Sequence, residues 1–143
     1  MKALDLIWKL WLSYKANTPS AEVIQNLLSI QKDDYFNDHI AFRTINSSSL
    51  NKESIAKHFL QYGWEVKGNY HFEEKHLNAI HLEHRSNIKL PKVFISELIL
   101  KKVSVSTEKI LSTAFEVYEQ DAKTESFLCI GRKHNINYND YQE

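Results

Sequence analysis

The stretch that decides the fold reads His-Ile-Ala-Phe-Arg-Thr-Ile at positions 39–45. β-Branched and aromatic residues are enriched in strands, so this segment predicts a β-strand. Successive side chains of a strand point to opposite faces of the sheet. His39 and Arg43 are therefore expected on one face of the strand, and Ile40 and Phe42 on the other.

The segments that follow this strand predict a βαβββ unit over residues 39–100. Leu50 and Asn51 have the character of a hydrophobic staple and an N-cap, and Gly63 stands where the helix would end. Three more strands are expected at residues 64–67, 77–84 and 93–100, with a turn at Gly68-Asn69 after the first of them. The fold class predicted from this order is α+β.

A helical hairpin is expected before this unit, in residues 1–31. Apolar residues recur at helical spacing over residues 3–15, and Thr18 followed by Pro19 is a typical start of a second helix, which would run to about residue 30. The apolar residues of this second helix are expected to point inward; they are Val23, Ile24, Leu27 and Leu28.

Residues 104–143 are expected to form a helix and a polar tail. Ser106 is the predicted N-cap of the helix, residues 127–131 are a candidate short strand, and residues 132–143 carry no periodic pattern. No linker or internal repeat divides the chain, so we expect one domain over residues 1–143 with the βαβββ unit between helical flanks.

The composition excludes several classes of function. Lys and Arg number 18, as do Asp and Glu, so no net charge attracts the chain to nucleic acid or an anionic membrane. No apolar run approaches the roughly 20 residues of a membrane-spanning helix, and the first residues do not resemble a signal peptide. The single cysteine, Cys129, forms no internal disulfide, which is typical of a reducing compartment and predicts a cytoplasmic protein.

The first candidate site is the pair His39 and Arg43. In a strand they lie roughly 13 Å apart along one face, a separation that suits a metal ligand at one end and a bidentate carboxylate clamp at the other. Asn37 and Asp38 precede the histidine and could orient its imidazole. The alternative is a solvated polar face on a half-buried strand.

Two further features could carry chemistry. Glu97 lies within a nearly continuous apolar strand, where a carboxylate is either bound to a metal or paired with Arg43 or a lysine. His81 and Glu83 share a strand face and are compatible with two metal ligands, or equally with an exposed strand edge. The other members of this second cluster are His71, His76, His84, Glu73 and Glu74.

Three blocks, in this order, resemble the 2-oxoadipate dioxygenase/decarboxylase (hydroxyglutarate synthase) family. They are residues 37–44 (Asn-Asp-His-Ile-Ala-Phe-Arg-Thr), residues 70–77 (Tyr-His-Phe-Glu-Glu-Lys-His-Leu) and residues 91–98 (Pro-Lys-Val-Phe-Ile-Ser-Glu-Leu). The resemblance is to the N-terminal half of such proteins. It implies a vicinal-oxygen-chelate-like fold, in which paired βαβββ modules curl around a metal.

The resemblance also implies a chemistry. Members of the family use non-haem Fe(II), held by two histidines and one carboxylate, to convert 2-oxoadipate and O₂ to 2-hydroxyglutarate. By motif, His39 would be the first iron ligand and would line the substrate site, and Arg43 would be the catalytic residue that holds a substrate carboxylate. Glu97 would lie close to the site without being one of the family's ligands, so its place as a candidate metal ligand rests on its position in the apolar strand alone. The second histidine and the carboxylate ligand of the family fall in later blocks that this sequence does not contain.

Three functions follow as alternatives. The first is an Fe(II)-dependent 2-oxo acid dioxygenase/decarboxylase, or a half-site of one that a homodimer would complete with two copies of His39. The second is a non-catalytic module that dimerises or binds a small acid. The third is a glyoxalase-type metal-dependent lyase or hydrolase, assembled as a dimer, with Glu97 as a metal ligand. The sequence leaves open whether the chain is itself an enzyme.

Overall fold

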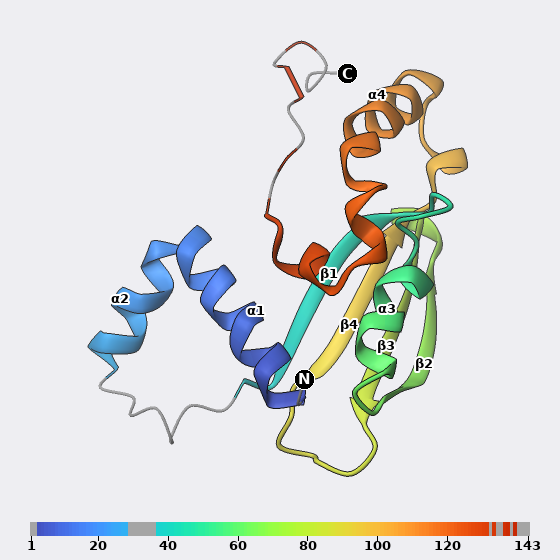
Figure 1. Ribbon diagram of the computed structural model, residues 1–143. Coiled ribbons are helices and arrows are strands. Elements are labelled where there is room, and N and C mark those ends of the chain that lie inside the picture. Colours follow the sequence, from blue (N-terminus) through green and yellow to red (C-terminus); the bar gives the residue numbers. More distant parts are fainter. Residues whose placement is uncertain (1–2, 29–36, 132, 134–135, 138, 140–143) are drawn as a thin grey trace.

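The computed structural model describes residues 3–28, 37–131, 133, 136–137 and 139. Its centre is a four-stranded sheet with the strand order β1-β4-β3-β2 (Figure 1). The strands are β1 (His39–Ile45), β2 (Trp64–Phe72), β3 (Leu77–His84) and β4 (Lys92–Leu98). β1 runs parallel to β4, and the other two neighbouring pairs are antiparallel.

The helices confirm the predicted order of a hairpin, a βαβββ module and a further helix. They are α1 (Ala3–Asn17), α2 (Pro19–Leu27), α3 (Lys52–Leu60) and α4 (Val105–Phe115). α1 lies beside the start of β1, α2 lies on the far side of α1, and α4 lies beyond the other end of the strands (Figure 1). None of the helices in the described ranges has the length and apolar character that crossing a membrane requires.

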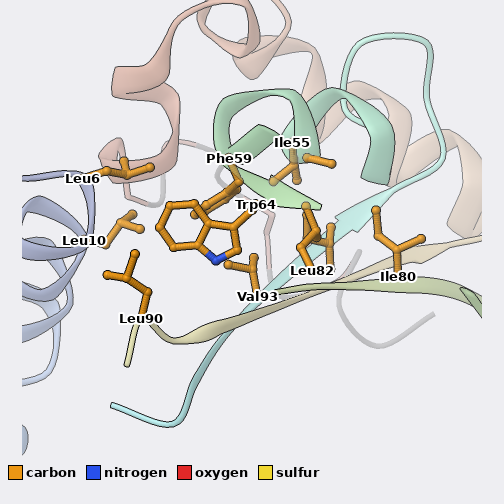
Figure 2. Packing of buried hydrophobic residues seen from close by; sticks show 11 residues of the cluster. Leu6, Leu10, Ile55, Phe59, Trp64, Ile80, Leu82, Leu90 and Val93 are labelled. Carbon is orange, nitrogen blue, oxygen red and sulfur yellow. The ribbon is translucent and has the colours of Figure 1, made fainter. Parts of the chain in front are cut away.

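The main core lies between α3, α1 and one face of the sheet. Figure 2 shows the Trp64 indole between the leucines of α1 and the sheet residue Val93. Phe59 of α3 is completely buried and packs edge-on against Trp64, with ring centroids 5.7 Å apart. The indole N–H donates to the carbonyl of Pro91 at 3.0 Å, so its one polar group is satisfied inside the core.

Local signals explain where α3 begins and ends. The side chain of Asn51 accepts a hydrogen bond from the backbone N–H of Ser54 at 2.8 Å, as expected of an N-cap. The backbone of Gly63 has a φ of 100°, a conformation that favours glycine after a helix. Both predictions are confirmed. At α4 the cap is Ser104, which accepts from the N–H of Thr107, and the prediction of Ser106 was wrong by two residues.

The predicted turn at Gly68-Asn69 is wrong, because β2 continues through it to Phe72. The strand bulges between Val66 and Gly68 and then stays paired with β3 to its end. The true turn follows at the 3-10 helix Glu73–Lys75. Cross-strand pairing therefore outweighs the turn propensity of the Gly-Asn pair.

The predicted short strand over 127–131 is also wrong, because a 3-10 helix spans Glu125–Cys129. Ser13 of α1 donates from its hydroxyl to the carbonyl of Cys129 at 3.3 Å, so this segment is bonded to the first helix, and the Phe127 side chain packs against the core. Most of the predicted polar tail, and the expected end of the second helix beyond residue 28, lie outside the described residues.

α2 begins at Pro19, as predicted, although the Thr18 hydroxyl makes no capping hydrogen bond. The prediction that its apolar side chains point inward is wrong, since all four are exposed; Leu27, for example, is 78% exposed. Among the described elements, α2 packs chiefly on α1. Periodicity identifies the apolar face of a helix, but it does not show what that face packs against.

Candidate active site

The face of the sheet opposite α3 carries the candidate site. Along β1, His39, Ala41 and Arg43 are exposed, while Ile40 and Phe42 pack toward the main core. The predicted alternation is therefore confirmed. We call this side of the sheet the open face and define it by His39, Ala41, Arg43, Tyr70, His81, Phe94 and Ser96.

Arg43 reaches across to the neighbouring strand. Its Nη1 donates to Oγ of Ser96, its register partner on β4, at 3.1 Å. Ser96 is only 3% exposed, so the hydrogen bond fixes one end of the guanidinium on a rigid part of the sheet. Among the described residues this is the only hydrogen bond of that side chain, and its other N–H groups can donate to a carboxylate in the fork geometry.

His39 is oriented by its neighbour, as the sequence predicted. Its Nδ1 donates to the Asp38 carboxylate at 3.0 Å, which leaves Nε2 directed away from that contact. A carboxylate behind an imidazole is a common arrangement at metal-binding histidines, because it sets the tautomer and raises the basicity of the ligand. Asn37 has no such contact with the ring but lines the pocket beside it.

A pocket of about 680 Å³ lies along the outer edge of β1, between that strand, α1 and the segment that follows Phe127. His39 lines it, together with Trp11, Tyr14, Ala41 and Leu128. Arg43 is not part of its lining, so this pocket contains only the histidine of the His39–Arg43 pair. The volume is in the range typical of small-molecule sites.

Tyr70, His81 and Glu83 lie together, although the sequence did not predict that the tyrosine joins the other two. The Tyr70 hydroxyl and Nδ1 of His81 are 2.8 Å apart, and Nε2 of His81 lies 3.6 Å from a Glu83 oxygen. The hydrogen bond from Lys92 to Glu83 holds the pKa of that carboxyl below its usual range. The shared face of His81 and Glu83 was predicted, whereas Tyr70 joins them only because β2 runs past Gly68.

Glu97 faces α3 and not the open face. Its Oε1 accepts from Nζ of Lys52 at 2.9 Å, and its Oε2 accepts from the Lys52 backbone N–H at 2.8 Å. Of the alternatives left open by the sequence, pairing with a lysine is therefore the one confirmed. Burial acts to lower the pKa of Lys52, but its hydrogen bonds to Glu53 and Glu97 outweigh that effect and raise it.

The remaining histidines of the predicted second cluster are dispersed. His84 packs edge-on against Trp64 and bonds through Nε2 with the carbonyl of Tyr62. His76 ends the 3-10 turn in a left-handed conformation, with φ of 53°. Within the described ranges, no group of three or more His, Cys, Asp or Glu side chains is placed to hold a metal ion. The described residues of the open face thus offer no set of three donors around His39, and they alone do not fit a complete iron site.

His71 predicts a pH-dependent contribution to stability. Its Nδ1 faces Oδ1 of Asn78 at 2.7 Å and its Nε2 faces Oε2 of Glu73 at 2.5 Å, and these two acceptors raise the pKa of the imidazole. Protonated His71 therefore stabilises the folded state. This contribution is fully present below the unfolded-state pKa of about 6.5, and it is lost as the pH rises through the raised pKa of the folded state.

The stability difference between the wild type and His71→Gln is therefore expected to be largest in acid and to shrink toward alkaline pH. Urea unfolding between about pH 5.5 and about pH 8.5 measures it. Glu73→Gln, which replaces the charged acceptor by a neutral amide, should flatten the same dependence. A difference that stays constant or grows with pH would contradict the assignment.

Comparison with known proteins identifies the family. A family model for 2-oxoadipate dioxygenase/decarboxylase matches residues 7–135. The chloroplastic 2-oxoadipate dioxygenase/decarboxylase of Arabidopsis thaliana is 29% identical over 105 residues, which make up 66% of this chain and 28% of that protein. The chloroplastic/amyloplastic protein of that name from Oryza sativa is 29% identical over 108 residues, or 68% of this chain and 30% of the relative.

Solved structures show the same fold. A protein from Shewanella frigidimarina, described as a candidate hydrolase, superimposes with a TM-score of 0.88 at 37% identity, over 96% of this chain and 54% of that one. Hydroxyglutarate synthase from Oryza sativa, solved with 2-oxoadipate, gives 0.83 at 24% identity, over 96% of this chain and 48% of that one. The chain thus spans about half the length of these two proteins. Because the family model covers most of its residues, this chain belongs to the 2-oxoadipate dioxygenase/decarboxylase family.

Proposed function

We propose that this chain is the acid-binding part of an Fe(II)-dependent 2-oxo acid dioxygenase/decarboxylase that takes a 2-oxoadipate-like acid and O₂. The observation that carries the proposal is the placement of His39 and Arg43 on one exposed face of β1, each oriented by a neighbouring side chain. Membership of the family supports the class of reaction.

Arg43 would bind one carboxylate of the acid. Ser96 already holds one N–H of the guanidinium, so less side-chain freedom is lost when the remaining N–H groups close on a ligand. His39 would contact the acid from the other end of the strand face and would be the iron ligand that this chain contributes. Iron, when bound, would supply the activation of O₂.

We propose that the remaining ligands come from a second βαβββ module. That module is either another part of a longer polypeptide or a second copy of this chain in a homodimer. His39 would fill one ligand position of the iron, and the described residues offer no complete set of ligands around it, which supports a second module as the source of the others. So does the sheet itself, in which β1 has a strand partner on only one side within the described residues.

The second candidate function is a small-acid-binding module without catalysis. Binding an acid without turnover needs only the Arg43 guanidinium, which this chain contains. Catalysis would also need a full set of metal ligands, which the described residues do not offer. The glyoxalase-type lyase or hydrolase is less well supported, because Lys52 already holds both carboxylate oxygens of Glu97. For the compartment we propose the cytoplasm, on account of the lone Cys129, although the two plant relatives are named as chloroplastic.

Arg43→Lys is expected to weaken the binding of 2-oxoadipate about tenfold, because an ammonium group replaces two parallel hydrogen bonds with one point charge. Calorimetric titration of the purified chain measures the affinity. Arg85→Lys is the matched control, since Arg85 lies beside Gly63 at the end of α3 and should leave the affinity unchanged. Equal affinity in the wild type and Arg43→Lys would remove Arg43 from the site.

Oxygen uptake with Fe(II) and 2-oxoadipate tests the reaction. Uptake that yields 2-hydroxyglutarate and is lost in His39→Ala would support an enzyme whose site a second copy completes. Binding without uptake would favour the non-catalytic acid-binding module. A folded chain that neither consumes oxygen nor binds the acid would overturn the proposal.

A further inference from the structure

Ala41 lies between His39 and Arg43 on the open face of β1, and all three residues are exposed. At about 3.3 Å per residue, Ala41 stands roughly 7 Å along the strand from each of the other two. The pocket of about 680 Å³ is lined by both His39 and Ala41, so open space adjoins both of these side chains. A single methyl group is therefore all that projects from β1 between the imidazole and the guanidinium.

The neighbouring strand adds a second apolar side chain beside this methyl group. Ala41 pairs in register with Phe94 of β4, which is half-buried and points to the same face. The Phe94 ring lies against the ring of Tyr70 on its other side, with centroids 6.0 Å apart. We call Ala41 and Phe94 together the apolar strip. It lies between two polar side chains, with an aromatic ring along its inner side.

A dicarboxylic 2-oxo acid carries its groups in the same order as this part of β1. 2-Oxoadipate has a 2-oxo carboxylate at one end, a second carboxylate at the other and a chain of methylene groups between them. When its polar ends lie at His39 and Arg43, the methylene groups lie over the apolar strip and leave water there, which favours binding. A larger side chain at position 41 would occupy the path of that chain.

We propose that Ala41 is a specificity-determining residue, because its small side chain lets the methylene chain of a 2-oxoadipate-like acid lie along β1 between His39 and Arg43. The inference rests on the proposed function, since it takes these two residues as the ends of the site. A methyl group makes no hydrogen bond and carries no charge, so position 41 acts through its size. Affinity for the acid should therefore follow the volume of this side chain and not the stability of the strand.

Two substitutions at this position separate size from stability. Ala41→Ile adds a β-branched side chain to an exposed strand position, where such residues favour the strand, so the protein should be at least as stable as the wild type. Ala41→Gly leaves the space open but weakens the strand, so it should be less stable. In calorimetric titration with 2-oxoadipate, Ala41→Ile is expected to bind about tenfold more weakly, and Ala41→Gly within about twofold of the wild type.

Asn69→Ile is the matched control. Asn69 is an exposed residue of β2, the strand at the opposite edge of the sheet from β1, so the same isoleucine there should leave the affinity unchanged. Urea unfolding of every variant gives its stability under the titration conditions. An effect that only reflects the stability of the strand would make Ala41→Gly the weaker binder, which is the reverse of the expected order.

The outcomes separate this inference from the function on which it rests. If Arg43→Lys weakens 2-oxoadipate but Ala41→Ile binds it as the wild type does, the role of Ala41 is overturned while the Arg43 clamp stands. Equal losses in Ala41→Ile and Asn69→Ile, or in Ala41→Ile and Ala41→Gly, overturn it as well. If the wild type does not bind 2-oxoadipate, the proposed function and this inference fail together. A loss confined to Ala41→Ile, with Ala41→Gly and Asn69→Ile unchanged, supports the inference.

Discussion

Phe59→Ala is expected to lower the free energy of unfolding by about 3–5 kcal/mol. Phe59 has no exposed surface, and its ring packs against Phe42 of β1 and Trp64 of β2, with centroid separations of 5.6 and 5.7 Å. The substitution removes a large apolar side chain from a site where helix and sheet meet, and the surrounding residues relax only partly into the cavity. Since a domain is stable by about 5–15 kcal/mol, one substitution would remove a large fraction of the total.

Urea unfolding followed by circular dichroism measures the loss. The matched control is Phe72→Ala at the exposed end of β2, which should cost less than about 1 kcal/mol. If Phe59→Ala does not fold, Phe59→Leu keeps most of the side chain and is expected to cost about 1 kcal/mol. Similar losses at positions 59 and 72 would contradict the placement of the core between α3 and the sheet.

The elements predicted well from the sequence are those with local causes. The alternation in residues 39–45, the N-cap at Asn51 and the glycine after α3 depend on residues close together in the chain, and the structure confirms them. Residues 127–131 looked like a strand by composition, but a 3-10 helix spans Glu125–Cys129 and bonds to α1, and it does not pair with the free edge of β1. Composition alone does not provide the pairing partner that a strand needs.

In the candidate site, too, contacts between neighbouring residues were predictable and contacts between distant strands were not. Asp38 adjoins His39 in the sequence, so their contact was predictable. The contact of Arg43 with Ser96 was not, because it requires β1 to pair in parallel with β4, more than fifty residues along the chain. Tyr70 was missed for a related reason, since the turn predicted at Gly68 would have ended its strand too early.

Lys52→Met is the second substitution with a large expected effect. It leaves the Glu97 carboxylate, whose side chain is 5% exposed, without its cationic partner and is expected to cost about 2–4 kcal/mol of unfolding free energy. The backbone N–H of Lys52 and the Asn78 amide still contact the carboxylate, which keeps the cost below that of a bare buried charge. Lys101→Met is the matched control, because its partner Glu108 is paired at the surface and the loss there should stay below about 1 kcal/mol.

The double variant Lys52→Met/Glu97→Gln tests whether the two side chains act as a pair. Once both charges are gone, no uncompensated charge is left buried, so the double variant should be less destabilised than the sum of the single variants by about 1–3 kcal/mol. Strict additivity would mean that the two groups contribute independently. Unfolding of Lys52→Met with added Fe(II) tests the alternative role of Glu97 as a metal ligand. If the released carboxylate binds the metal, Fe(II) should restore stability. If Glu97 only anchors the start of α3, Fe(II) should have no effect.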